Sequence, residues 1–109
     1  MNPSSNPDPE LSALLHDLWQ KHLPSTRERL DLLDRAAQMA VEGHLDETSR
    51  AEAQAVAHKL SGNLGMFGHR KAGEVASDVE HIFKAPIPQD AAILSQHMRH
   101  LRELLQAYL

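Results

Sequence analysis

Apolar residues recur with a helical period along most of this chain, and no segment shows the sustained alternation of a β-strand. The pattern covers residues 10–22, 26–42, 49–67, 69–84 and 90–108. Because the breaks between these segments are short, neighbouring helices are expected to run antiparallel. With 109 residues, the chain is long enough for one hydrophobic core and one domain. The sequence therefore predicts an all-α fold, an up-down antiparallel four-helix bundle.

A short additional N-terminal helix is expected in front of the four main helices. Pro24 interrupts the first periodic stretch, and Ser25 with Glu28 has the spacing of a capping box that starts a new helix. Two arrangements are open at this point. The short helix either covers an end of the bundle or merges with the next helix across Pro24. Its apolar stripe consists of Leu11, Leu14, Leu15 and Leu18.

Two boundaries follow from local composition. Residues 1–9 are rich in Pro, Ser and Asn, so we predict a disordered N-terminal tail there and a helical domain over residues 10–109. The third helix has two candidate starts. Ser49 with Glu52 forms a second capping box, and Asp46 is a competing N-cap.

Charge and composition exclude several classes of function. The net charge of −4 argues against a nucleic-acid or anionic-membrane partner. The absence of cysteine excludes disulfides and thiolate zinc sites, and no apolar run is long enough to span a bilayer. The absence of cysteine fits a cytoplasmic protein, and we expect a monomer because the apolar stripes are about as wide as one bundle core needs. The eight histidines invite a metal hypothesis, but no complete ligand set with metal spacing appears, so no metal site is predicted.

The outward face of the third helix is unusual. On a helical wheel of about 100° per residue, the apolar residues of this helix share one side, and His58 lies roughly 140° from their centre. Gly62, Ala51 and Ala55 share the outward side with His58. Each glycine inside a helix costs about 0.5–1 kcal/mol relative to alanine. Such a face admits another molecule close to His58, although small residues also permit close packing against a neighbouring helix of the same chain.

At these residues the sequence resembles histidine-containing phosphotransfer (Hpt) domains. Their signature is a histidine with a leucine two residues on, a lysine three on, a glycine four on and a second glycine about ten on. The matching residues here are His58, Leu60, Gly62, Phe67 (at a usually aliphatic position) and Gly68. The helical layout is similar as well, so the resemblance covers nearly the whole chain after the tail. Ser61 stands where the family has its lysine.

The resemblance implies a phosphorelay intermediate. His58 would accept a phosphoryl group from a receiver-domain aspartate, or from a sensor or hybrid histidine kinase, and pass it to another receiver. The chain would act as a carrier without ATP-dependent kinase activity, and no glycine-rich ATP motif is present. It would need no cofactor, since the receiver supplies the aspartate and a Mg²⁺ site. The alternative is a non-catalytic adaptor bundle, a degenerate Hpt domain, which the missing lysine favours.

The same resemblance assigns supporting roles around His58. Candidates for stabilising the phosphoryl group are Lys59, Ser61, Arg70 and Lys71. Partner docking is assigned to Ala51, Ala55, Gly62, Asn63, Gly65, Met66 and His69. The acidic residues Glu74, Asp78 and Glu80 are expected to form a solvated face.

Overall fold

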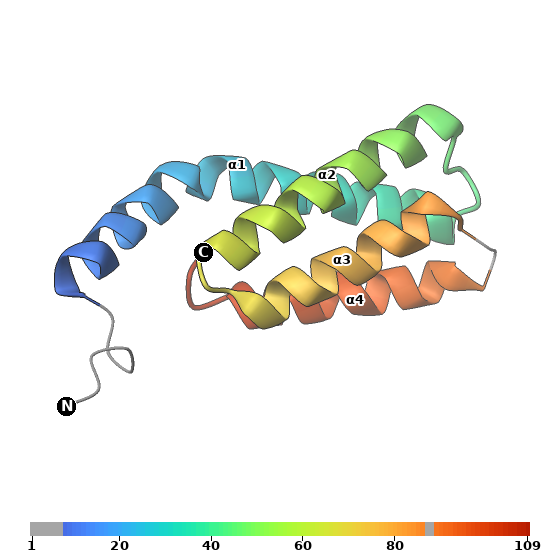
Figure 1. Ribbon diagram of the computed structural model, residues 1–109. Coiled ribbons are helices and arrows are strands. Elements are labelled where there is room, and N and C mark those ends of the chain that lie inside the picture. Colours follow the sequence, from blue (N-terminus) through green and yellow to red (C-terminus); the bar gives the residue numbers. More distant parts are fainter. Residues whose placement is uncertain (1–7, 87–88) are drawn as a thin grey trace.

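Four α-helices run up and down as an antiparallel bundle (Figure 1). The computed structural model describes residues 8–86 and 89–109. The helices are α1 (Pro9–Val41), α2 (Glu47–Met66), α3 (Arg70–Lys84) and α4 (Asp90–Leu105). Each helix packs against two neighbours in the ring α1–α2–α3–α4, and the α2–α3 pair has the most extensive contact. The predicted all-α four-helix bundle is confirmed, and no strand occurs within the two described ranges.

The predicted short additional helix is not a separate element, because α1 continues through Pro24 as one helix of 33 residues. A proline inside a helix costs about 3 kcal/mol through its missing N–H and its steric clash. Buried side chains anchor α1 on both sides of this position, with Trp19 and Leu23 before it and Leu30 after it. Each such burial contributes about 1.5–3 kcal/mol, which offsets the penalty. The capping box predicted at Ser25 therefore lies inside the helix, and α1 is bent (Figure 1).

The N-terminal part of α1 projects beyond the other helices (Figure 1). Leu11, Leu14 and Leu18 are 50%, 54% and 36% exposed, so the predicted stripe has a helical period without being part of the core. Of the predicted disordered tail, residues 1–7 lie outside the described residues. Asp8 accepts a hydrogen bond from the backbone N–H of Glu10 at 2.9 Å, and α1 begins at Pro9.

Local capping and turn chemistry set the ends of α2. Asp46, not Ser49, is the N-cap, and its carboxylate accepts a hydrogen bond from the Ser49 backbone N–H at 2.7 Å. This hydrogen bond lowers the pKa of the Asp46 carboxyl. After α1 and α2, the chain turns at Gly43 and Gly68, whose φ angles of 74° and 84° lie in the left-handed region that favours glycine. Both connections are therefore tight, which fixes the antiparallel order.

The core consists of large apolar side chains from all four helices. The largest fully buried ones are Leu30, Leu33, Leu60, Leu64, Val79, Phe83, Leu94, Met98, Leu101 and Leu105. The last helical segment, expected over residues 90–108, ends at Leu105, so Tyr108 lies beyond α4 and is 51% exposed. Over the described ranges, none of the helices combines the length and the apolar character that crossing a membrane requires.

Candidate functional site

His58 lies on the outward side of α2, and its side chain is 76% exposed. Its neighbours Ala57 and Leu60 are fully buried, so the core contacts of α2 fix the rotation that turns His58 toward solvent. The predicted outward direction of this histidine is confirmed. An imidazole in this position is accessible to another macromolecule without any rearrangement of the bundle.

Glu80 of α3 contacts the His58 ring. The Nδ1 atom of His58 lies 3.1 and 3.2 Å from the two carboxylate oxygens of Glu80. Because an ionised carboxylate only accepts hydrogen bonds, Nδ1 carries the hydrogen and donates it. In the neutral ring, the reactive lone pair is then on Nε2.

The prediction that Glu80 belongs to a solvated acidic face is wrong, since only 21% of its side chain is exposed. A helical wheel of α3 does not single it out. From the centre of the apolar stripe, Glu80 lies roughly 95° to one side and Asp78 roughly 105° to the other, whereas Glu74 lies about 145° away. Only the packing of α2 on α3 distinguishes the two edge residues, because Glu80 is the one that faces α2.

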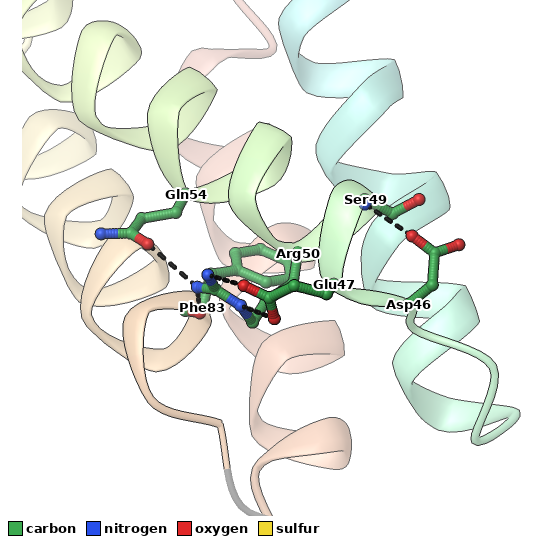
Figure 2. Close-up of polar contacts among 6 residues, drawn as sticks. All are labelled: Asp46, Glu47, Ser49, Arg50, Gln54 and Phe83. Atoms are coloured by element: carbon green, nitrogen blue, oxygen red, sulfur yellow. Dashed lines mark hydrogen bonds and ion pairs between the residues drawn. The ribbon is translucent and has the colours of Figure 1, made fainter.

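Arg50 joins the N-terminal part of α2 to the end of α3 (Figure 2). Its Nη1 atom donates to the backbone carbonyl of Phe83 at 2.8 Å and to the side-chain oxygen of Gln54 at 3.0 Å. Its Nε and Nη2 atoms donate to the Glu47 carboxylate at 2.8 and 2.6 Å. Since the last carbonyls of a helix lack partners within the helix, Arg50 satisfies one at the end of α3. This bond fixes the two helices on one side of His58.

Ser61, the residue in place of the family's lysine, is directed toward α3. Its hydroxyl donates to the backbone carbonyl of Gly73 at 2.9 Å. The two helices approach closely here, because a Cβ atom added to Gly73 would lie 3.2 Å from the Ser61 carbonyl oxygen and 3.4 Å from the Gly65 backbone nitrogen. Ser61 therefore fixes α2 to α3 on the other side of His58.

The small residues on the outward side of α2 do not serve packing within the bundle. We call Ala51, Ala55, Gly62 and Gly65 the open face, and all four are exposed. A Cβ atom added to Gly62 or Gly65 would meet no atom of the described residues within 4 Å. Met66, next to this face, is 59% exposed. Within the described chain, close helix packing therefore accounts for Gly73 and not for Gly62 or Gly65.

The candidate cations fall into two groups. Lys59 and His58 line one hollow together with Ala51, Gln54, Ala55 and Glu80. Arg70 and Lys71 line a different surface with Glu74, to which Arg70 is ion-paired at 3.3 Å. Arg70 is ten residues from Glu80 on the same helix, or about 15 Å along its axis. The structure thus brings Lys59 close to His58 and leaves Arg70 and Lys71 at the far end of α3.

His69, a predicted docking residue, belongs to an aromatic cluster at one end of the bundle. Its ring centroid lies 4.6 Å from that of Trp19 and 4.5 Å from that of Tyr108. The Trp19 indole donates to the Tyr108 carbonyl at 3.0 Å, and Phe67 packs edge-on against Trp19. Burial lowers the pKa of the His69 imidazole. Asn63, another docking candidate, is half-buried.

Comparisons with known proteins identify the family. The family model described as "Hpt domain" matches residues 9–109. Protein RcaC of Microchaete diplosiphon is 30% identical over 69 residues, which are 63% of this chain and 11% of that protein. The chain thus corresponds to a small part of this relative's length. No solved structure gives a significant match. Across the part of the chain that the structure describes, no three His, Asp or Glu side chains gather as a metal site. Since the family model covers almost the entire chain, this protein belongs to the Hpt domain family, whose role is phosphoryl transfer through histidine in phosphorelays.

Proposed function

We propose that this protein is a phosphorelay intermediate in which His58 is the phosphoacceptor. One observation carries the proposal. His58 is exposed, its Nδ1 is hydrogen-bonded to Glu80, and its Nε2 has no hydrogen-bond partner among the described residues and lies beside a face of small residues. The donor is a receiver-domain aspartyl phosphate or a sensor or hybrid histidine kinase, and the next acceptor is another receiver.

The tautomer of His58 suits in-line attack by Nε2. The Nε2 lone pair forms the N–P bond while the P–O bond to the donor aspartate breaks, and the aspartate leaves as a carboxylate. The ring becomes positively charged and keeps its proton on Nδ1, next to the Glu80 carboxylate. In the onward step the next aspartate attacks phosphorus, and the N–P bond breaks with its electron pair returning to Nε2. Neither step requires a proton to move within this chain.

Phosphoryl transfer needs positioning and charge compensation more than covalent chemistry from the carrier. Lys59 is the cation we assign to the phosphoryl oxygens on this chain, because it lines the same hollow as His58. Ser61 contributes to the placement of α2 through its bond to Gly73. The remaining charge compensation comes from the receiver, including its Mg²⁺ site.

The open face is the surface we assign to receiver docking, with Met66 at its border. From Ala51 to Met66 it extends fifteen residues along α2, or about 22 Å. Glycine and alanine allow the backbone of a partner to come close to α2, so that a receiver aspartate can reach Nε2. Asn63, near the end of α2, and His69, in the connection between α2 and α3, are both half-buried.

The test is phosphoryl transfer from a labelled receiver domain. Wild-type protein should acquire an acid-labile label, and His58→Gln should acquire none. His81→Gln is the matched control. His81 is also exposed and also has Nδ1 hydrogen-bonded, to the Ser77 carbonyl at 2.7 Å, yet it lies on α3 away from the open face. This control should label as the wild type does, and ATP alone should label none of the three proteins.

Two outcomes contradict the proposal. Label that persists in His58→Gln assigns the phosphoacceptor to another residue. Absence of label with every receiver and kinase of the source organism favours the alternative, a non-catalytic adaptor bundle that binds its partner without chemistry.

A further inference from the structure

We propose that Glu80 keeps Nδ1 protonated after Nε2 of His58 has been phosphorylated, and thereby makes the phosphohistidine a short-lived, readily transferred form. This inference rests on the proposed function and concerns the lifetime of its intermediate. Glu80 is a positioning residue in this reaction, since it acts through the imidazole ring and does not touch the phosphorus atom.

The protonation of Nδ1 decides how well the ring leaves. When Nδ1 carries its proton, breaking the N–P bond returns the electron pair to Nε2 and releases neutral imidazole. When Nδ1 has lost its proton, the same step releases an imidazolate anion, which is a much poorer leaving group. A carboxylate at hydrogen-bond distance favours the protonated, positively charged ring over the neutral one. The Glu80 oxygens at 3.1 and 3.2 Å from Nδ1 meet that condition.

The charged side chains around His58 stabilise the imidazole ring more than they stabilise a phosphoryl group on it. Among the described residues, Glu80 of α3 and Lys59 of α2 are the charged side chains that line the hollow with His58. The helix α1 also packs against α2, but its Arg35 lines a separate hollow with Glu52, and α4 does not pack against α2.

This chain supplies less charge to neutralise the phosphoryl oxygens. One turn beyond His58, where a lysine would neutralise phosphoryl oxygens, Ser61 supplies no charge and its hydroxyl is hydrogen-bonded to Gly73. A carrier that stabilises its leaving group, and supplies one lysine for the phosphoryl oxygens, is suited to rapid transfer more than to storage of the phosphoryl group.

The experiment measures the lifetime of the phosphohistidine without any protein partner. Wild type, Glu80→Gln and Asp78→Asn are phosphorylated with phosphoramidate, the reagent is removed, and loss of the label is followed by ³¹P NMR. Asp78→Asn is the matched control, because it removes one carboxylate from the exposed side of the same helix.

At pH 8 the wild type and Asp78→Asn should lose the phosphoryl group about two- to fivefold faster than Glu80→Gln, the range expected for one partly exposed ion pair. At pH 5.5 the solvent protonates the ring in all three proteins, so the rates should converge. Equal lifetimes of wild type and Glu80→Gln at pH 8 would overturn this inference alone. Failure of phosphoramidate to label His58 would overturn it together with the proposed function, whereas labelling without transfer from any receiver would overturn the proposed function.

A spectroscopic measurement separates the role of Glu80 from a purely structural one. In ¹⁵N–¹H correlation spectra of the unphosphorylated protein, the His58 hydrogen should be on Nδ1 in the wild type and in Glu80→Gln, whose amide oxygen still accepts. It should move to Nε2 in Glu80→Leu, which has no acceptor. A wild-type spectrum with the hydrogen on Nε2 would overturn the inference whatever the lifetimes.

Discussion

The substitution Gly62→Ala should stabilise the fold. It therefore tests whether Gly62 is required for folding or for docking of a partner. Gly62 lies inside α2, and a Cβ atom added there meets no atom of the described residues within 4 Å. Its φ is not positive, so alanine fits the backbone without strain. Replacing a helical glycine by alanine then recovers the conformational penalty of about 0.5–1 kcal/mol.

Gly73→Ala is the matched comparison, because the same change introduces a clash. The new Cβ atom would lie 3.2 Å from the Ser61 carbonyl oxygen, which belongs to the backbone of α2 and is therefore hard to displace. Overpacking of this kind costs about 1–3 kcal/mol. After subtraction of the helix-propensity gain, we expect a net destabilisation of about 1 kcal/mol for Gly73→Ala.

The assay for stability is urea and thermal unfolding followed by circular dichroism at 222 nm. For a domain of this size, Gly62→Ala should raise Tm by about 2–6 °C and Gly73→Ala should lower it by a similar amount. The assay for function is transfer from a phosphorylated receiver. Gly62→Gln adds a long side chain next to His58 in a helix that tolerates it, and transfer should fall at least about tenfold, equivalent to about 1.4 kcal/mol.

Two results refute this reasoning. If Gly62→Ala lowers the free energy of unfolding, the glycine serves the fold in a way that the structure does not account for. If Gly62→Gln folds and transfers at the wild-type rate, the open face is not the docking surface, whatever the role of His58.

Two further predictions concern the contacts that surround the site. Ser61→Ala should lower the free energy of unfolding by about 0.5–1.5 kcal/mol, since it removes the hydrogen bond to the Gly73 carbonyl; an unchanged urea midpoint would contradict that role. Burial lowers the pKa of His69 below its usual value near 6.5, so the unfolded chain binds that proton more readily. The stability that neutral His69 contributes is therefore present above about pH 6.5 and declines as the pH falls below it. Urea unfolding at pH 7.5 and 5.5, followed by the fluorescence of Trp19, the chain's only tryptophan, should show a larger loss in wild type than in His69→Phe. Equal losses in the two proteins would assign the pH dependence to other groups.

The helices were predictable because each is amphipathic with its own period, and that property is local. The ends of the helices were less predictable, because other contacts outweighed the capping signals at Ser25 and Ser49. Ser25 follows a proline that buried neighbours hold within α1, and Asp46 provides the cap of α2. The stripe that begins at Leu11 has helical periodicity, but periodicity alone does not tell whether another helix covers the stripe.

The outward direction of His58 was predictable for the same local reason, since it follows from the apolar residues of its own helix, whereas its proposed role as phosphoacceptor rests on the resemblance to Hpt domains. The contact with Glu80 was not predictable, because these residues are 22 positions apart and meet only through the packing of α2 on α3. Sequence also left open whether Gly62 and Gly65 serve a neighbouring helix or an external partner. The answer depends on whether another helix lies against these glycines, and only the three-dimensional structure shows this.

The pairing of α2 with α3 relates the fold to the proposed chemistry. Three bonds connect these helices in succession, from Arg50 to the Phe83 carbonyl, from His58 to Glu80, and from Ser61 to the Gly73 carbonyl. The first and third place the two backbones, so that the second can hold one imidazole nitrogen without burying the ring. A lysine at position 61 would add charge for the phosphoryl group but would remove the third hydrogen bond, at a point where the two helices approach closely. Under the proposed function, the departure from the family signature therefore gives up charge for the phosphoryl group and keeps a hydrogen bond between α2 and α3, about two helical turns from Glu80.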